Sequence, residues 1–149
     1  MKFLMSLILA ATLAAPAHAD EVIIEGLPVM QAADVDLEEF LWLNRVLVVF
    51  AATERDPAYT KQIELLTVRP DDLAARNVVV LLDTDPANPS SARTQLRPRG
   101  FSLVLIDLDG TVKLRKPAPW SVREIGSSID KSVLRREEIR NRTGLEPLP

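Results

Sequence analysis

Residues 101–115 read FSLVLIDLDGTVKLR, and this stretch decides the fold. Residues 101–108 are largely apolar, a pattern that predicts a strand. Asp109 and Gly110 predict a tight turn, because such a turn needs positive φ angles at its central residues. Residues 111–115 alternate, with Val112 and Leu114 on one face, as in a half-exposed edge strand. The stretch therefore predicts a β-hairpin.

Two earlier runs, residues 45–52 and 77–82, are apolar and show no alternation. Such runs predict strands buried on both faces, as in a parallel sheet covered by helices. Asp56 and Pro57 predict a helix start, with aspartate as the cap and proline at the first helical position, and Pro70 is expected to end that helix. Shorter elements are expected as a strand at 21–25, helical pieces at 37–43 and 92–96, and a short turn or second helical piece at 71–76.

A last helix is predicted from the capping residue Ser121 to about Arg142. Its apolar stripe consists of Val122, Ile125, Ile129, Val133 and Leu134. The order strand, helix, strand, helix, strand, hairpin strand, helix, with a right-handed βαβ start, is the layout of thioredoxin-like proteins. We expect an α/β fold: a central mixed β-sheet flanked by helices, with a C-terminal β-hairpin plus helix.

The domain is expected to span residues 37–142, after an extended acidic lead-in at 20–36 and before a disordered tail at 143–149. Residues 1–19 are predicted to be a secretory signal, with Lys2, an apolar run at 3–13, and small residues at Ala17 and Ala19 around the cleavage site. The alternative, a membrane anchor, needs about 20 apolar residues. We therefore expect a periplasmic or secreted protein that begins at Asp20 and has no transmembrane anchor.

Composition excludes several chemistries. The chain has no cysteine, and its one histidine, His18, leaves with the signal. Thiol–disulfide and peroxidase activity, a serine–histidine or cysteine–histidine nucleophile and a typical zinc site are thereby excluded. We predict no metal and no cofactor. After loss of Lys2 the chain has 17 basic and 21 acidic residues, so nucleic acid is not an expected partner.

The resemblance to thioredoxins can be examined at two landmarks. Their first central strand leads into a Cys-Gly-Pro-Cys loop; here Arg55 and Ala58 stand where the cysteines would, around Asp56 and Pro57. Ser102 replaces the proline of the Gly-Ile-Pro-Thr segment that faces those cysteines. The resemblance implies a degenerate active-site groove with Arg55, Asp56 and Ser102 as candidate residues. The Cα atoms of Arg55 and Ser102 are expected within about 10 Å.

More closely, residues from about 37 to 142 resemble the bacterial family catalogued as domain of unknown function 4174, in a peroxiredoxin-like branch. The shared motifs appear as Trp42 with Arg45, the segment 101–110, Ile129 with Asp130, and the segment 135–138. The sequence departs from the family pattern at residues 131–134. The resemblance implies a fold and an extracytoplasmic compartment, but no activity.

Charges suggest two further sites. Arg55 at a helix start is a candidate anion contact, or a solvated residue paired with Asp56. The candidate anion-binding surface comprises Lys113, Arg115, Lys116, Arg135 and Arg136. The alternative is a solvated edge strand whose cations discourage edge pairing. A further alternative is that the basic segment 97–142 and the acidic segment 20–44 lie near each other and neutralise each other's charge.

Three functions stay open. The favoured one is an exported non-catalytic thioredoxin-like module that binds a protein or an anionic partner in the periplasm. The second is an enzyme or carrier that uses the degenerate groove with non-thiol residues, and a cavity between Arg55 and Ser102 would favour it. The third is a structural role in an envelope complex through the acidic N-terminal arm. The identity of the ligand, the biological process and the oligomeric state do not follow from the sequence.

Overall fold

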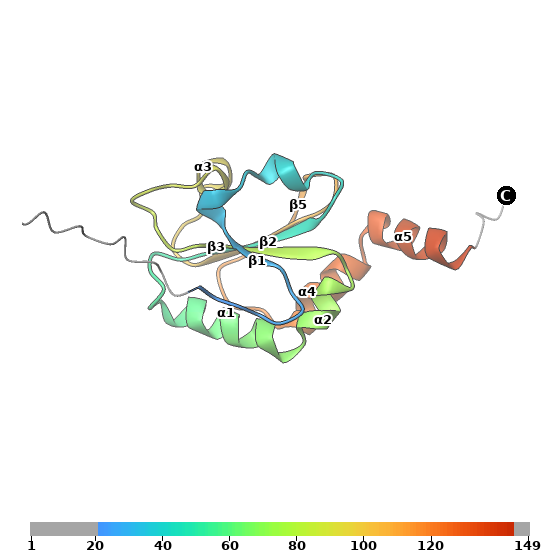
Figure 1. Cartoon of the computed structure of the whole chain (residues 1–149), viewed down its shortest axis with the longest axis horizontal. Coiled ribbons are helices and arrows are strands. Elements are labelled where there is room, and N and C mark those ends of the chain that lie inside the picture. Colours follow the sequence, from blue (N-terminus) through green and yellow to red (C-terminus); the bar gives the residue numbers. More distant parts are fainter. Residues whose placement is uncertain (1–20, 145–149) are drawn as a thin grey trace, which may run out of the picture.

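The computed structural model describes residues 21–144, which fold around a five-stranded mixed sheet (Figure 1). The strands are β1 (Val29–Gln31), β2 (Arg45–Phe50), β3 (Val78–Asp83), β4 (Ser102–Ile106) and β5 (Val112–Lys116). Their order across the sheet is β1-β3-β2-β4-β5, with β1, β3 and β2 parallel and with β4 and β5 each antiparallel to the preceding neighbour. The predicted α/β thioredoxin-like arrangement is confirmed.

Helical elements cover both faces of this sheet, which explains why every residue of β2, β3 and β4 is buried. One face carries α1 (Pro57–Val68), α2 (Pro70–Ala74) and α4 (Val122–Asp130). The other carries the short 3₁₀ helices η1 (Ala32–Asp34) and η2 (Leu37–Phe40) together with α3 (Ser91–Leu96). The last helix, α5 (Val133–Thr143), extends away from the sheet (Figure 1).

The predicted helix starts are confirmed at two positions. The Asp56 carboxylate accepts a hydrogen bond from the N–H of Ala58 at 2.8 Å and caps α1. Ser121 caps α4 and exchanges hydrogen bonds with Glu124 in a capping box. The helix end predicted at Pro70 is confirmed: α1 ends at Val68, because Arg69 directly precedes the proline and leaves the helical conformation. Pro70 also begins α2, since proline is well suited to the first position of a helix.

Two predicted elements are wrong. The N-terminal strand is Val29–Gln31 and not residues 21–25, where Ile24 makes only an isolated bridge to Leu27. The single last helix is two helices, because the Ser132 hydroxyl accepts from the N–H of Arg135 and caps α5. Val133 is 61% exposed, so the buried apolar stripe ends at Ile129. The break falls in the segment where the sequence departs from the family pattern.

The hairpin contains a β-bulge that the alternating sequence did not predict. Leu105 pairs with Leu114, but Ile106 pairs with Val112, so the register shifts between them. Leu114 therefore packs into the core beside α1 and α4, while Val112 lies exposed toward η2. The expectation that Val112 and Leu114 share one face is wrong for this reason.

Candidate functional site

The end of the sheet that corresponds to the thioredoxin active site is formed by the end of β2 and the start of β4. Phe50, the last residue of β2, pairs with Ser102, the first residue of β4. The chain then leaves β2 through a turn in which the N–H of Arg55 donates to the Thr53 hydroxyl at 3.1 Å. Arg55 and Ser102 thus belong to segments that meet at one end of the sheet, and the expected Cα distance stays a prediction.

Arg55 and Asp56 do not pair with each other at this loop. The Asp56 carboxylate is used as the cap of α1. The side chain of Arg55 makes no ion pair within residues 21–144, with Asp56 or with any other carboxylate. Asp56 is therefore a structural residue of the helix start.

A cavity of about 420 Å³ opens beside Ser102, and three arginines from separate segments line it. Arg97 follows α3, Arg99 lies in the loop before β4, and Arg115 lies on β5. The remaining lining residues are Leu96, Phe101 and Pro117. We call this cavity the arginine pocket. Arg55 does not line it.

Local backbone geometry brings these arginines together. Arg97 ends α3 in the left-handed conformation with φ 46°, and its N–H donates to the carbonyl of Arg93 at 2.9 Å. Gly100, with φ 60°, turns the chain again before β4. Arg115 lies opposite Val104 of β4 and so reaches the same end of the sheet. Two left-handed residues within one loop therefore place Arg97 and Arg99 around the buried Ser102.

The arginine pocket carries uncompensated positive charge. Arg97, Arg99 and Arg115 are exposed, and none forms an ion pair with a carboxylate of the described chain. Like charges held close together repel each other, and an anion among them removes that repulsion. Guanidinium groups also match the oxygen geometry of carboxylate, phosphate and sulfate groups. The pocket is suited to bind an oxyanion.

The five cations predicted as one anion-binding surface have different surroundings in the structure. Arg115 lines the arginine pocket, whereas the ammonium of Lys116 lies 4.5 Å from the centre of the Trp120 ring in a cation–π contact. Lys113 is exposed at the bulge, and Arg136 donates to the carbonyl of Lys131 at 3.3 Å.

Arg135 differs most from that prediction, because it is buried and its guanidinium faces Glu138 at 3.1 Å and Asp130 at 3.7 Å. Arg97 and Arg99 replace it as candidates. The only sequence signal for them was the excess of basic residues from position 97 onward.

The motif residues of the sequence meet in a network of ion pairs at the opposite end of the sheet. Arg45 contacts Asp107 at 2.9 Å and Glu138 at 3.2 Å. Arg76 makes two hydrogen bonds to Asp130, and these hold the pKa of Asp130 below its ordinary value and raise that of Arg76. The network comprises Arg45, Asp107, Glu138, Arg135, Asp130 and Arg76.

This network ties α4 and α5 to the sheet. Its carboxylates are engaged by guanidinium groups, although Asp107 Oδ2 and Arg45 Nη2 are buried without a hydrogen-bond partner in the described chain. Within residues 21–144, no group of three or more acidic side chains is placed to hold a metal ion. The shared motif therefore specifies structure.

Fold and site together define a thioredoxin-like domain that has no cysteine. The structure resembles a reduced 2-Cys peroxiredoxin of Plasmodium vivax (TM-score 0.55, 19% identity, 70% of this chain and 85% of that chain). It also resembles chloroplastic thioredoxin z (TM-score 0.53, 20% identity, 75% and 99%). At these identities the likeness establishes the fold alone.

Residues 36–138 match the family model described as Domain of unknown function (DUF4174), and the chain belongs to this family. Coiled-coil domain-containing protein 80 of Danio rerio is 30% identical over an alignment of 133 residues, and the match covers 69% of this chain. The match spans only 15% of that protein's length.

Within residues 21–144, none of the helices combines the length and the apolar character needed to cross a membrane.

Proposed function

We propose that this protein is an exported, non-catalytic thioredoxin-like module that binds an oxyanion of a periplasmic partner in the arginine pocket. The observation that carries the proposal is the convergence of Arg97, Arg99 and Arg115 around the buried Ser102 without a compensating carboxylate in the described chain. The predicted signal at residues 1–19, which lies outside the described residues, supports export.

The composition of the pocket favours binding over catalysis. Its lining residues within the described chain supply three guanidinium groups and one hydroxyl, and none is a carboxylate. Arginine stays protonated at any ordinary pH, so it cannot act as a general base toward Ser102. A cavity between Arg55 and Ser102 would favour the enzyme or carrier alternative, but the cavity at Ser102 gives it no support, because Arg55 does not line it.

Inorganic phosphate is a suitable first probe. In a titration followed by ¹H–¹⁵N NMR, we expect saturable shifts at the backbone amides of Arg97, Arg99 and Arg115. The double variant Arg97→Gln/Arg99→Gln should bind phosphate at least tenfold more weakly, which corresponds to about 1.4 kcal/mol.

The matched control is Arg69→Gln/Arg123→Gln, which removes two exposed arginines that lie away from the pocket. An equal loss of affinity in this control would show that binding depends on overall charge and not on the pocket. Chemical-shift changes that rise linearly with phosphate concentration, without saturation, would also contradict a specific binding site.

A further inference from the structure

A second cavity, of about 270 Å³, lies on the face of the sheet that η1, η2 and α3 cover. It is bounded by η2, α3 and the β4–β5 hairpin, and most of its lining is apolar. The apolar residues that matter here are Leu37, Phe40, Leu41, Leu96, Ile106 and Val112. We call it the η2 cavity. It shares only Leu96 with the arginine pocket.

Two exposed apolar side chains line the η2 cavity, and two more follow Leu41 directly in sequence. Leu41 and Val112 line the cavity and are each 45% exposed, while the neighbouring Trp42 and Leu43 are 63% and 64% exposed. A tryptophan this exposed is unusual in a soluble domain, and tryptophans of this kind often dominate the energy of protein interfaces. Leu41, Trp42 and Leu43 thus form a run of three consecutive exposed apolar residues that begins at the cavity.

The backbone holds Trp42 in a strained conformation that presents it to solvent. Its φ is 62°, in the left-handed region that bulky residues rarely occupy. The Trp42 N–H donates to the carbonyl of Leu108 at 2.7 Å, which ties the segment to the hairpin. Gly110 supports the arrangement, because a Cβ at that position would lie 3.1 Å from Leu41 Cδ1. Strain of this kind persists where the surrounding structure fixes it, and it is concentrated at functional sites.

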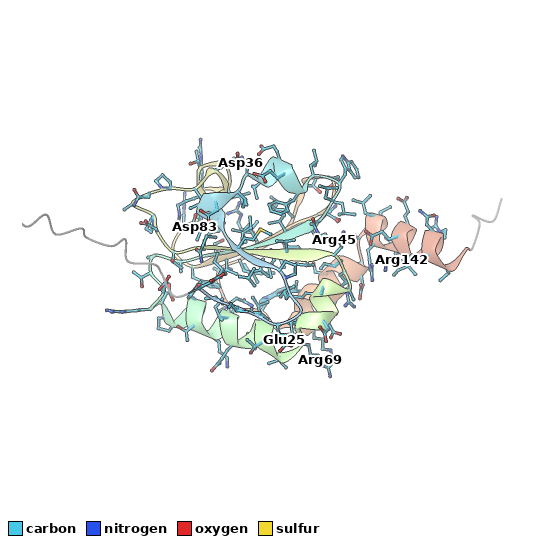
Figure 2. All side chains as sticks on the ribbon, in the orientation of Figure 1. Glu25, Asp36, Arg45, Arg69, Asp83 and Arg142 are labelled. Carbon is cyan, nitrogen blue, oxygen red and sulfur yellow. The ribbon has the colours of Figure 1, made fainter. Side chains whose placement is uncertain are left out.

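The surroundings of the η2 cavity are acidic. Glu38 and Asp107 line the cavity, and no lining residue is basic. Asp107 is paired with the buried Arg45, so the exposed Glu38 supplies the uncompensated negative charge there. Asp34 on η1, Glu39 on η2 and Asp36, which directly precedes η2, are exposed as well. Figure 2 shows Asp36 on this face, with Glu25 and Arg69 on the opposite one. This charge repels acidic partners and anionic lipid headgroups and attracts basic ones.

We propose that the η2 cavity and the segment Leu41, Trp42 and Leu43 dock a basic amphipathic segment of a partner protein. One apolar side chain of that segment enters the cavity, whose volume suits a leucine or a phenylalanine. Its lysines or arginines lie against Glu38, Asp36 and Glu39. Amphipathic segments that bind in an apolar groove likewise place their apolar side chains in the groove and their polar side chains outside it. The site differs from the arginine pocket in place and in the charge that it selects.

The test uses the mature chain and a fluorescein-labelled synthetic helix of leucine and lysine, with binding followed by fluorescence anisotropy. Two further peptides separate the contributions: in one glutamate replaces lysine, and in the other serine replaces leucine. We expect the leucine–lysine peptide to bind, and both other peptides to bind at least tenfold more weakly. Saturating inorganic phosphate should leave this affinity unchanged.

Variants of the protein locate the site. Val112→Glu and Glu38→Lys should each weaken the leucine–lysine peptide at least tenfold. The matched controls are Val68→Glu, at a residue that is 70% exposed on α1, and Glu25→Lys, on the opposite face. Thermal unfolding confirms that each variant is folded. In addition, binding should shift the tryptophan emission of the wild-type protein to shorter wavelength, and Trp42→Phe should abolish the shift.

Three results would overturn the proposal. The first is equal binding of the leucine–lysine and leucine–glutamate peptides. The second is a loss of peptide affinity in Val68→Glu or Glu25→Lys that is as large as the loss in Val112→Glu. The third is self-association of the mature chain in sedimentation that Val112→Glu abolishes, because a second copy would then be the occupant of this face.

Discussion

The Nε of Arg45 lies 2.9 Å from Oδ1 of Asp107, and neither side chain is more than 2% exposed. Removing one member of a buried pair leaves the other charge unpaired in a poorly solvated place. We expect Arg45→Met or Asp107→Leu to reduce the free energy of unfolding by about 3–5 kcal/mol, measured by urea denaturation. The double variant should lose much less than the two single losses combined.

The control for this cycle is Lys61→Met at the exposed pair of Lys61 and Glu64, whose side chains are 59% and 66% exposed. Such a surface pair contributes at most about 0.5 kcal/mol. If the Arg45 and Asp107 losses simply added, the pair would not be coupled and the ion-pair interpretation would fail.

The pairing of Asp130 with Arg76 predicts acid sensitivity. Hydrogen bonds from Arg76 lower the pKa of Asp130 in the folded state. The contribution of the ionised Asp130 carboxylate to stability is therefore complete above the pKa of this group in the unfolded chain. It is lost as pH falls through the pKa of the group in the folded state. Between about pH 6 and about pH 3, the urea midpoint of the wild-type protein should fall further than that of Asp130→Asn. Parallel curves for the two proteins would contradict this role.

Tyr59 offers a spectroscopic check of the core, since it is the only tyrosine in the chain. Burial, with a smaller effect from Glu54, raises its pKa to about 12. The neutral phenol therefore stabilises the fold below about pH 10, and this contribution is lost as pH rises toward the folded-state pKa. Ultraviolet titration should give a midpoint well above that of the protein in urea, where about 10 is expected. Coincident midpoints would show that Tyr59 is solvated.

The predicted export signal can be tested by intact-mass spectrometry. The small residues Ala17 and Ala19 predict cleavage before Asp20. Protein recovered from the periplasm should have the intact mass of the chain from Asp20 onward, and Ala19→Arg should hinder processing. Recovery of the full-length chain with its first methionine would refute the signal.

The sequence predicts those parts of the fold that local patterns determine. The buried strands β2 and β3 follow from apolar runs without alternation, and the caps Asp56 and Ser121 from the preferences of helix starts. The edge strand Val29–Gln31 was missed because three residues hold too little pattern, and its pairing with β3 depends on tertiary structure. The break before Ser132 was missed because a capping serine and a serine on the exposed face of a helix look alike in sequence.

The candidate sites depend even more on tertiary structure. Arg97 and Arg115 are distant in sequence and meet only because β5 pairs with β4. The η2 cavity needs the bulge that turns Val112 away from Leu114, and alternation alone predicts the opposite. Arg135 looked like a surface cation, and only the folded chain shows that Asp130 and Glu138 surround it.

The attachment of α5 has a consequence for how the molecule opens. Arg135 is its only buried residue, and its apolar Val133 and Ile139 are exposed, so charges rather than apolar burial hold this helix in place. Such an element can detach while the sheet stays intact, as a cooperative unit of low stability. Its amide protons should then exchange with deuterium through a local opening that added salt makes more frequent, long before those of β2 exchange through global unfolding.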